Sequence, residues 1–248
     1  MRNLLVTGAS SGVGKCVVEH YASRNWNIIA CARRISKMDK NFRKFNNVKT
    51  CYLDFTNTES INDLIDFTYG NINYICNCSG FLSRGKLSSK NFPDIHRSIQ
   101  TNALGIFTLL LGLLPHLKNQ NFGRIVNLTS GAPLNCFPEF AHYSASKAVL
   151  NALTQTLAKE VSSYNLKINL MSPGPVKSEM SPDSKLNPNI CLPTLDYLLE
   201  LDNDGPTGKF FWLGYEVPLA PNLDGVDWLN GIANDQLIPI SGLSNLDE

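Results

Sequence analysis

Apolar runs of strand length alternate with longer helical runs from the N-terminus to about Pro173, and this alternation is the strongest constraint on the fold. Several of the apolar runs are nearly continuous, as expected for parallel strands that helices cover on both faces. Parallel strands joined through helices make right-handed crossovers. The sequence therefore predicts an α/β fold, in which a doubly wound parallel sheet is the middle of three layers in a single domain. The expected strands are Asn3–Thr7, Asn27–Ala32, 48–53, 74–76, 124–128 and 167–171, and the expected helices are 14–24, 58–69, 92–117 and 143–163.

Beyond Pro173 the regular alternation stops. Prolines predict a loop over 181–193, followed by a short helix at 193–201 and one more strand at 208–213. We expect residues 1–220 to form one domain with halves at about 1–120 and 121–220. The stretch 221–248 holds five acidic residues and no Lys or Arg, yet it includes apolar side chains such as Trp228. This composition predicts an acidic extension that docks on a surface.

Composition excludes several function classes. The 248 residues include 22 Lys and Arg against 21 Asp and Glu, so no basic surface for nucleic acid is expected. The seven cysteines form no CxxC pair, which argues against a metal site and favours reduced thiols. No signal peptide is evident, and the apolar run 103–114 is too short to span a bilayer. We therefore predict a cytoplasmic protein with no metal site, no nucleic-acid partner and no membrane segment.

A glycine-rich turn follows the first predicted strand and opens the first helix. Glycines allow a tight turn and a close approach of the backbone to a pyrophosphate, while the helix N-terminus offers free N–H groups. The position inside a strand–helix–strand unit favours a dinucleotide site over the alternative of an ordinary turn. The predicted cofactor-binding residues of this turn are Gly8, Ser10, Ser11, Gly12, Val13 and Gly14.

The window 31–37 at the end of the second predicted strand holds no acid and three bases, Arg33, Arg34 and Lys37. An acid at this point would bind the ribose hydroxyls of NAD(H), whereas an arginine pairs with a 2′-phosphate. The window therefore favours NADP(H) over NAD(H); the alternative is that both arginines are solvated loop charges. Asp54 follows the third strand, where it either accepts from the adenine amino group or caps the next helix.

A third motif places Tyr143 and Lys147 four residues apart, on one face of a predicted helix. An unperturbed tyrosine is a poor base at pH 7, and a neighbouring ammonium lowers the pKa of the phenol. The pair therefore has the properties of a general acid/base. Ser130 lies at the end of the strand 124–128, at the sheet edge where ligands bind.

These three motifs, in this order and spacing, resemble the short-chain dehydrogenase/reductase family in its single-domain branch, which has a Rossmann fold. The resemblance covers more than two thirds of the chain. It implies an NADP(H)-dependent enzyme that interconverts a carbonyl and an alcohol by hydride transfer. Tyr143 would be the acid/base, Lys147 would lower its pKa and hold the nicotinamide ribose, and Ser130 would bond the substrate oxygen. Asn102 would hold a water in the proton relay.

Other implications of the resemblance concern the cofactor and the assembly. Asn77 and Gly80 belong to a segment that matches Asn-Asn-Ala-Gly beside the cofactor, although Cys78 and Ser79 replace its two middle residues. The family also implies a small-molecule substrate and a homodimer or homotetramer. The segment after Ser178 is short, which predicts a reduced flap over the substrate. The residues matching the segment that flanks the nicotinamide are Pro173, Gly174, Val176 and Ser178.

Single residues near these motifs have two interpretations each. Arg84 and Lys177 are either surface charges or contacts for a substrate carboxylate or phosphate. Cys136 is either a pocket thiol or an apolar filler, and His142 is expected to have no catalytic role. The predicted apolar pocket walls are Phe81, Leu82, Leu134, Phe137 and Phe140.

Two other functions remain open from the sequence. A non-catalytic module that senses NADP(H) would have the same fold but no need of a proton relay. An epimerase or dehydratase of nucleotide sugars would need a larger C-terminal substrate domain than this chain provides.

Overall fold

The computed structural model describes residues 2–88 and 93–219, together with residues 226, 229, 232, 237 and 238. The chain divides into two units, Met1–Val217 and Pro218–Glu248, close to the boundary predicted at 220. Most of the acidic extension, including Trp228, lies outside the described residues. Its docking therefore stays a prediction.

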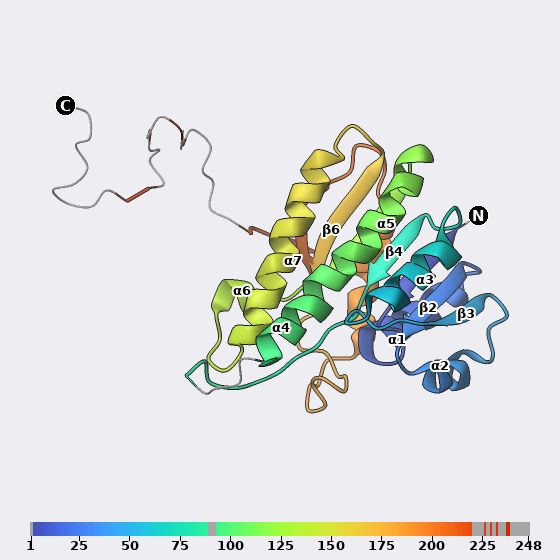
Figure 1. The fold of residues 1–248 in the computed structure, drawn as a ribbon, viewed down its shortest axis with the longest axis horizontal. Coiled ribbons are helices and arrows are strands. Elements are labelled where there is room, and N and C mark those ends of the chain that lie inside the picture. Colours follow the sequence, from blue (N-terminus) through green and yellow to red (C-terminus); the bar gives the residue numbers. More distant parts are fainter. Residues whose placement is uncertain are drawn as a thin grey trace. The chain divides into compact units, whose positions relative to one another are not determined.

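The first unit is built on one sheet of eight strands in the order β3-β2-β1-β4-β5-β6-β7-β8 (Figure 1). All neighbours are parallel except β7 and β8, which are antiparallel. The order reverses beside β1, and this switch point opens the crevice in which such sheets bind ligands. The predicted α/β fold with a doubly wound parallel sheet is confirmed. The strands are β1 Asn3–Thr7, β2 Asn27–Ala32, β3 Val48–Tyr52, β4 Tyr74–Asn77, β5 Gly123–Leu128, β6 Leu166–Ser172, β7 Phe210–Trp212 and β8 Tyr215–Val217.

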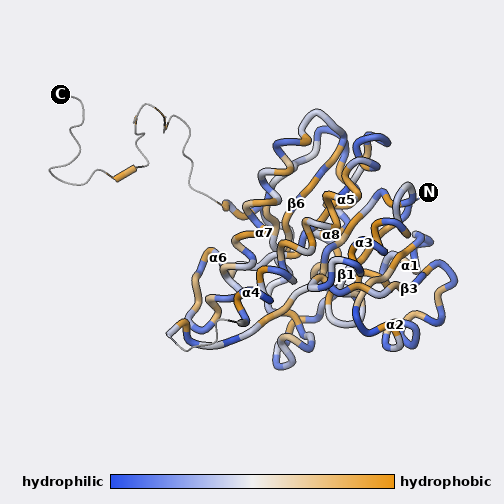
Figure 2. The backbone as a smooth tube through the Cα atoms, viewed as in Figure 1, coloured by the Kyte–Doolittle hydropathy of each residue, from blue (hydrophilic) through white to orange (hydrophobic). Residues whose placement is uncertain are grey.

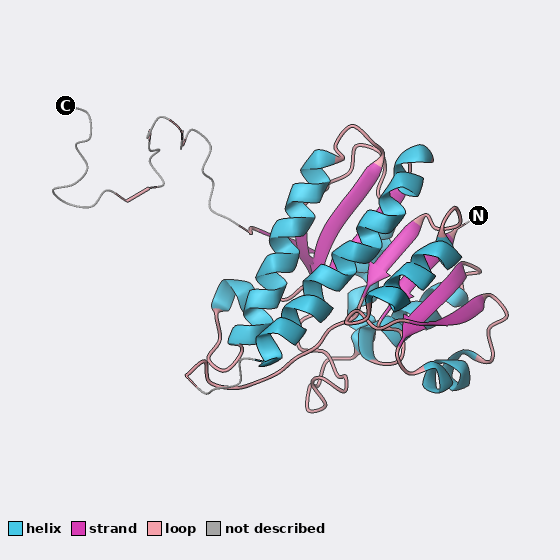
Figure 3. Cartoon of the chain, in the orientation of Figure 1, coloured by secondary structure: helices cyan, strands magenta, loops and turns pink. Residues whose placement is uncertain are grey.

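Helices cover both faces of the sheet (Figure 3). Alternate strand residues point to opposite faces, so Leu4 and Val6 join one core cluster with the helices α1, α2 and α8, whereas Leu5 faces the other side. Hydrophobic residues concentrate in the strands and on the sheet-facing sides of helices (Figure 2). The helices are α1 Gly12–Ala22, α2 Ile35–Phe42, α3 Thr58–Thr68, α4 Pro93–Ile99, α5 Gly105–Asn119, α6 Ala132–Asn135, α7 Ala141–Glu160 and α8 Leu192–Leu199.

The predicted single helix 92–117 is interrupted. A π-helical turn, η1 Gln100–Leu104, separates α4 from α5. Sequence analysis also missed α2, which buries only Met38 and Phe42 among many polar residues, and the short elements α6 and β8. By length and composition alone, the run Asp94–Asn119 is long and apolar enough to cross a membrane. Half of its most apolar stretch of 18 residues is buried within the structure.

Asp196 of α8 links that helix to α1. Its carboxylate accepts hydrogen bonds from the Tyr21 hydroxyl at 2.9 Å and from Arg24 Nη1 at 2.7 Å, and it lies 3.0 Å from His20 Nε2. Burial alone would raise the pKa of Asp196, but its bonds with these three side chains outweigh burial and lower the pKa below its ordinary value. The ionised carboxylate therefore stabilises the fold.

We expect Asp196→Asn to lower the free energy of unfolding by about 1–3 kcal/mol at pH 7, because the amide loses charge-assisted bonds. A depressed pKa contributes stability that is present above the unfolded pKa and is lost as pH falls through the folded pKa. The difference between wild type and variant should therefore shrink on acidification below about pH 4. Urea denaturation at both pH values measures it, with the exposed Asp63→Asn as control. Equal stability of wild type and Asp196→Asn at pH 7 would contradict the expectation.

Candidate active site

A cavity of about 980 Å³ lies along the carboxyl ends of the parallel strands. It joins the glycine-rich turn after β1 to the segment after β6, so residues far apart in sequence share one wall. Of the nineteen residues predicted for the site, all except Asn77 and Asn102 line it. The lining residues that had been predicted are Gly8, Ser10, Ser11, Gly12, Val13, Gly14, Arg33, Arg34, Asp54, Gly80, Ser130, Tyr143, Lys147, Pro173, Gly174, Val176 and Ser178.

The glycine-rich turn leaves no room for side chains at two positions. Gly8 has a positive φ of 67°, and a Cβ there would lie 2.7 Å from the Cys78 carbonyl carbon. A Cβ on Gly14 would lie 2.4 Å from the Gly8 carbonyl oxygen. The turn is therefore packed against β4 and closed on itself, with its outer side toward the cavity. Such a cradle fits a dinucleotide pyrophosphate at the N-terminus of α1.

Arg34 lies beside this cradle. Its Nη2 donates to Ser10 Oγ at 2.8 Å and to Ser11 Oγ at 3.1 Å. On its other side, Nη1 lies 2.8 Å from Glu179 Oε2, and Lys37 forms an ion pair with the same carboxylate. Sequence analysis did not single out Glu179, because no local pattern connects it to residues about 140 positions away.

Asp54 takes part in the turn before α3. Its Oδ1 accepts from the Thr56 N–H at 2.9 Å and from the Thr56 hydroxyl at 2.7 Å. The N-terminal cap of α3 is Asn57, whose side chain accepts from Ser60 N–H, so the interpretation of Asp54 as the cap is wrong. Burial would raise the pKa of Asp54, but the bonds with Thr56 and the nearby Arg33 lower it.

Asn77 was predicted to bind the cofactor, but it is fully buried behind the cavity wall. It accepts from Thr7 Oγ1 at 3.3 Å and donates to Asn127 Oδ1 at 2.8 Å. Asn127 in turn donates to Thr154 Oγ1 at 3.0 Å, so a chain of buried polar side chains crosses from β1 to α7. Buried amides need such partners, and the network fixes the strand ends beneath the cavity.

Tyr143 and Lys147 project from α7 into the same cavity as Ser130. Lys147 Nζ donates to the Leu128 carbonyl at 2.6 Å, at the end of β5, and it lies 5.9 Å from the centre of the Tyr143 ring. The Ser130 hydroxyl accepts from the Ala132 N–H at 3.1 Å. The helix and the strand end thus bring a phenol, a hydroxyl and an ammonium to one place.

Burial governs the protonation of the phenol and the ammonium. Burial raises the pKa of the Tyr143 phenol to about 12, although its hydrogen bond with Ser130 acts in the opposite direction. Burial also lowers the pKa of Lys147 to about 7, so the lysine is only partly charged at neutral pH. Burial is the largest influence on both groups, and the predicted lowering of the Tyr143 pKa by Lys147 stays a prediction.

Asn102 lies in the π-helical turn, and its side chain is fully buried. Its Oδ1 accepts from Phe81 N–H at 2.6 Å, while Nδ2 donates to the Phe81 carbonyl at 2.8 Å and to Ser146 Oγ at 2.8 Å. The side chain thus ties the loop after β4 to α7. Its water-holding role stays a prediction. π-Helical turns often mark functional sites, because the extra residue widens the helix.

The other end of the cavity is mostly apolar, and its walls include the five predicted apolar residues. Arg84 also lines it, with its guanidinium 4.8 Å from the centre of the Phe140 ring. Cys136 is exposed at the end of α6 and bonds the Pro133 carbonyl, which does not support a pocket thiol. Lys177 is exposed beside the cavity.

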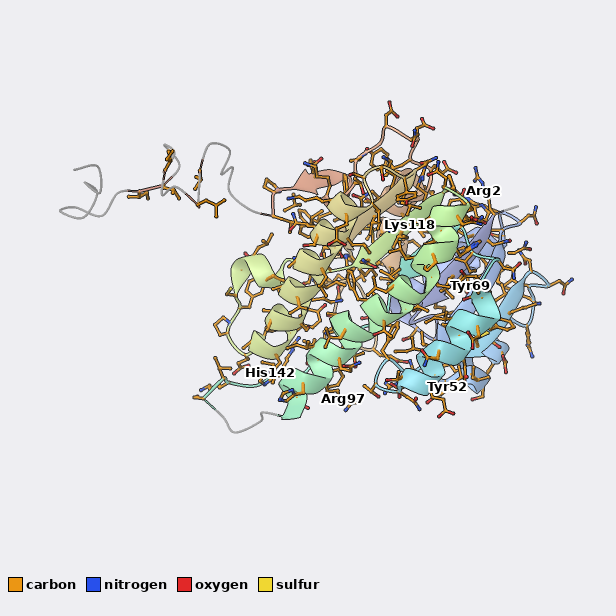
Figure 4. All side chains as sticks on the ribbon, turned by 45° about the horizontal axis from the view of Figure 1, so that its top comes forward. Arg2, Tyr52, Tyr69, Arg97, Lys118 and His142 are labelled. Carbon is orange, nitrogen blue, oxygen red and sulfur yellow. The ribbon has the colours of Figure 1, made fainter. Side chains whose placement is uncertain are left out.

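His142 is buried where α4 packs on α7, at the same end of the molecule as Arg97 (Figure 4). Among the residues that the structure describes, neither ring nitrogen of His142 has a hydrogen-bond partner. Its expected lack of a catalytic role stays a prediction.

Comparison with known proteins identifies the family. Residues 2–189 match the family described as short chain dehydrogenase. The chain belongs to this family. An uncharacterized oxidoreductase of Staphylococcus saprophyticus is 27% identical over 188 residues, which cover 73% of this chain and 80% of that protein. An uncharacterized oxidoreductase of Staphylococcus epidermidis is 29% identical over 181 residues, covering 71% of this chain and 79% of that one. This short chain dehydrogenase is accordingly an oxidoreductase.

Solved structures agree with the fold. A short chain dehydrogenase/reductase family protein superposes with a TM-score of 0.81 at 21% identity, covering 86% of this chain and 96% of the other. A tyrosine-to-phenylalanine variant of ElxO with NADPH bound superposes with a TM-score of 0.78 at 25% identity, covering 86% and 97%. Membership of the family implies a nicotinamide cofactor for this short chain dehydrogenase.

Proposed function

We propose that this short chain dehydrogenase reduces a carbonyl compound to an alcohol with NADPH, and catalyses the reverse oxidation with NADP⁺. The observation that carries the proposal is the cavity along the carboxyl ends of the parallel strands. It joins a cradle shaped for a dinucleotide to Ser130, Tyr143 and Lys147 at the start of an apolar pocket. Apolar walls with a few converging polar groups are typical of small-molecule sites.

The residues present fit the cofactor. Gly8 and Gly14 allow the tight turn at the N-terminus of α1, and Pro173, Gly174 and Val176 line the same cavity. When bound, a nicotinamide nucleotide supplies or accepts the hydride. Arg34, which donates to Ser10 and Ser11, supports NADP(H) over NAD(H), since a guanidinium group pairs with phosphate in a fork geometry.

In the reduction, Ser130 and Tyr143 would orient the carbonyl group of the substrate, and Tyr143 would deliver a proton. Ser130 and Tyr143 would donate hydrogen bonds to the carbonyl oxygen, which polarises the carbonyl and holds its carbon in place. Tyr143 would then give its phenolic proton to the alkoxide. A phenol whose pKa is raised to about 12 stays protonated at neutral pH, which suits this general-acid step.

Lys147 would restore the proton on Tyr143. With a pKa lowered to about 7, the amine holds a proton below neutral pH and gives it up readily above it. The supply of protons through Lys147 therefore falls as pH rises through about 7. Asn102 is a positioning residue here, because it holds the loop after β4 against Ser146 of α7.

We also propose that the chain works in the cytoplasm as a homodimer or homotetramer. Leu104 of η1 and Leu111 of α5 are exposed, at 44% and 53% of their surfaces. Contiguous exposed apolar surface marks protein interfaces, and these two leucines are candidates for such a surface. Light scattering measures the molar mass, and the mass of a single chain would contradict the oligomer.

The proposal is tested by fluorescence titration with NADPH and NADH, followed by turnover assays with a panel of carbonyl compounds. We expect tighter binding of NADPH. Arg34→Gln should weaken NADPH binding about tenfold or more and leave NADH binding nearly unchanged, because one charge-assisted pair is lost. Arg43→Gln, on the exposed end of α2, is the matched control.

The outcomes separate the candidate functions. Preference for NADH would overturn the proposed cofactor but leave the oxidoreductase in place. Tight NADPH binding without turnover of any carbonyl in the panel would favour a module that only senses the nucleotide. Binding of neither nucleotide would contradict the proposed function.

A further inference from the structure

Glu179 occupies Arg34, the cation that the proposed function assigns to the cofactor, and it also pairs with Lys37. Its two carboxylate oxygens face different partners: Oε2 lies 2.8 Å from Arg34 Nη1, and Oε1 pairs with Lys37 Nζ. The same Arg34 reaches Ser10 and Ser11 of the glycine-rich turn with its other nitrogens. The fork of Arg34 is thus shared between the nucleotide cradle and a carboxylate of the protein.

The segment 178–181 carries Glu179 across the mouth of the cavity. A Cβ on Gly12 would lie 3.1 Å from Ser178 Cβ, and a Cβ on Gly80 would lie 3.4 Å from Met180 Cε, so the segment reaches both sides. Ser178 and Ser181 exchange backbone hydrogen bonds at 3.2 and 3.1 Å. This closed turn fixes the direction in which Glu179 projects.

The turn is also attached at its base. Lys177 N–H donates to the Leu186 carbonyl at 2.7 Å, and Val176 and Leu186 form a parallel bridge. Because both ends are tied, the position of Glu179 near Arg34 is a property of the fold of this segment. The contact does not depend on a long free loop.

A carboxylate and a 2′-phosphate compete for the same groups. Both are anions that accept from guanidinium and ammonium nitrogens, and both prefer the fork of an arginine. Two anions on one pair of cations repel each other, so binding of one lowers the affinity for the other. Among the described residues that line the cavity, the only other carboxylate is Asp54, which is engaged by Thr56.

We infer that Glu179 sets the cofactor preference of this enzyme by competing with the 2′-phosphate of NADP(H) for Arg34 and Lys37. The inference rests on the proposed function. NAD(H) has a hydroxyl in place of this phosphate, so its binding leaves the Glu179 ion pairs intact. Glu179 therefore weakens the binding of NADPH and not that of NADH. The difference between the two affinities is smaller than Arg34 and Lys37 would produce without Glu179.

The test compares Glu179→Gln with wild type by titration of NADPH and NADH at low ionic strength. We expect the Kd for NADPH to fall about fivefold and the Kd for NADH to change less than about twofold, because exposed ion pairs have modest strength. The gain should shrink in high salt, which screens exposed charges. Glu200→Gln is the matched control, since Glu200 is equally exposed and pairs with a single arginine, Arg2, at 3.2 Å.

A second background separates competition from a general charge effect. In the double variant Arg34→Gln/Lys37→Gln, the further change Glu179→Gln should leave the Kd for NADPH unchanged. The inference would be overturned if Glu179→Gln lowered the Kd for NADPH as much in the double variant as in the wild type. It would also be overturned if Glu200→Gln lowered that Kd by the same factor. The inference would also be overturned if Glu179→Gln had the same ratio of NADPH to NADH affinity as the wild type.

The inference and the proposed function fail in different ways. If the wild-type enzyme binds NADPH but Glu179→Gln has no selective effect, the inference falls and the function stands. If the wild-type enzyme binds neither nucleotide, both fall. Thermal melting of each variant shows whether it is folded, and a Glu179→Asp variant, which keeps the charge on a shorter side chain, should show a smaller gain than Glu179→Gln.

Discussion

Tyr143→Phe is expected to lower kcat for carbonyl reduction by about three orders of magnitude, because it removes the proton donor of the reaction. The ring would keep its packing on α7, so the fold and the nucleotide cradle should remain. The Kd for NADPH should therefore stay within about threefold of the wild-type value. Initial rates under saturating NADPH and a fluorescence titration measure the two quantities.

Tyr69→Phe is the matched control, since Tyr69 is half exposed at the end of α3, away from the cavity (Figure 4). It loses the same hydroxyl and should retain full activity. Near-normal turnover of Tyr143→Phe would refute the assignment of Tyr143 as the acid. A parallel loss of NADPH binding would instead show that the phenol acts mainly in holding the nucleotide.

Gly14→Ala is expected to abolish tight nucleotide binding and to destabilise the fold. The new Cβ would lie 2.4 Å from the Gly8 carbonyl oxygen, which is a backbone atom of the turn, so the turn must shift. Overpacking of this kind costs about 1–3 kcal/mol of stability. Loss of one or two charge-assisted bonds to the pyrophosphate corresponds to roughly a hundredfold weaker binding. Denaturant unfolding and NADPH titration check the two effects.

Gly70→Ala separates steric overlap from backbone strain. Gly70 has a positive φ of 84°, but a Cβ there would meet nothing within 4 Å. Its replacement should cost about 1 kcal/mol through the left-handed conformation alone and leave nucleotide binding unchanged. If Gly14→Ala bound NADPH as tightly as Gly70→Ala does, the close packing of the turn would not be what shapes the cradle.

Buried polar side chains beneath the cavity hold the walls of the site in place. Thr7, Asn77, Asn127 and Thr154 are each fully buried and joined in one chain of hydrogen bonds. Asn102 makes three bonds that tie the loop after β4 to α7. Polar networks that are fully satisfied are rigid, because each broken bond would leave an unpaired group in the core.

The sequence predicted what depends on local order along the chain. The strand–helix alternation, the glycine-rich turn and the four-residue spacing of Tyr143 and Lys147 are short-range patterns, and each led to the correct element. Interruptions within an element were harder to see. The π-helical turn at Gln100–Leu104 has no sequence signal that separates it from the helices on either side, and α2 buries too few residues to show a clear period.

Only the tertiary structure decided the contacts between distant segments and the protonation states. The pairing of Glu179 with Arg34 and Lys37 depends on how the segment after β6 lies across the turn after β1. Asn77 was placed at the cofactor by resemblance, yet its register with Thr7 and Asn127 in the neighbouring strands turns its amide into the sheet. The raised pKa of Tyr143 and the lowered pKa of Lys147 follow from burial by the whole fold. Desolvation sums over atoms from many segments, whereas a sequence motif records only neighbours along the chain.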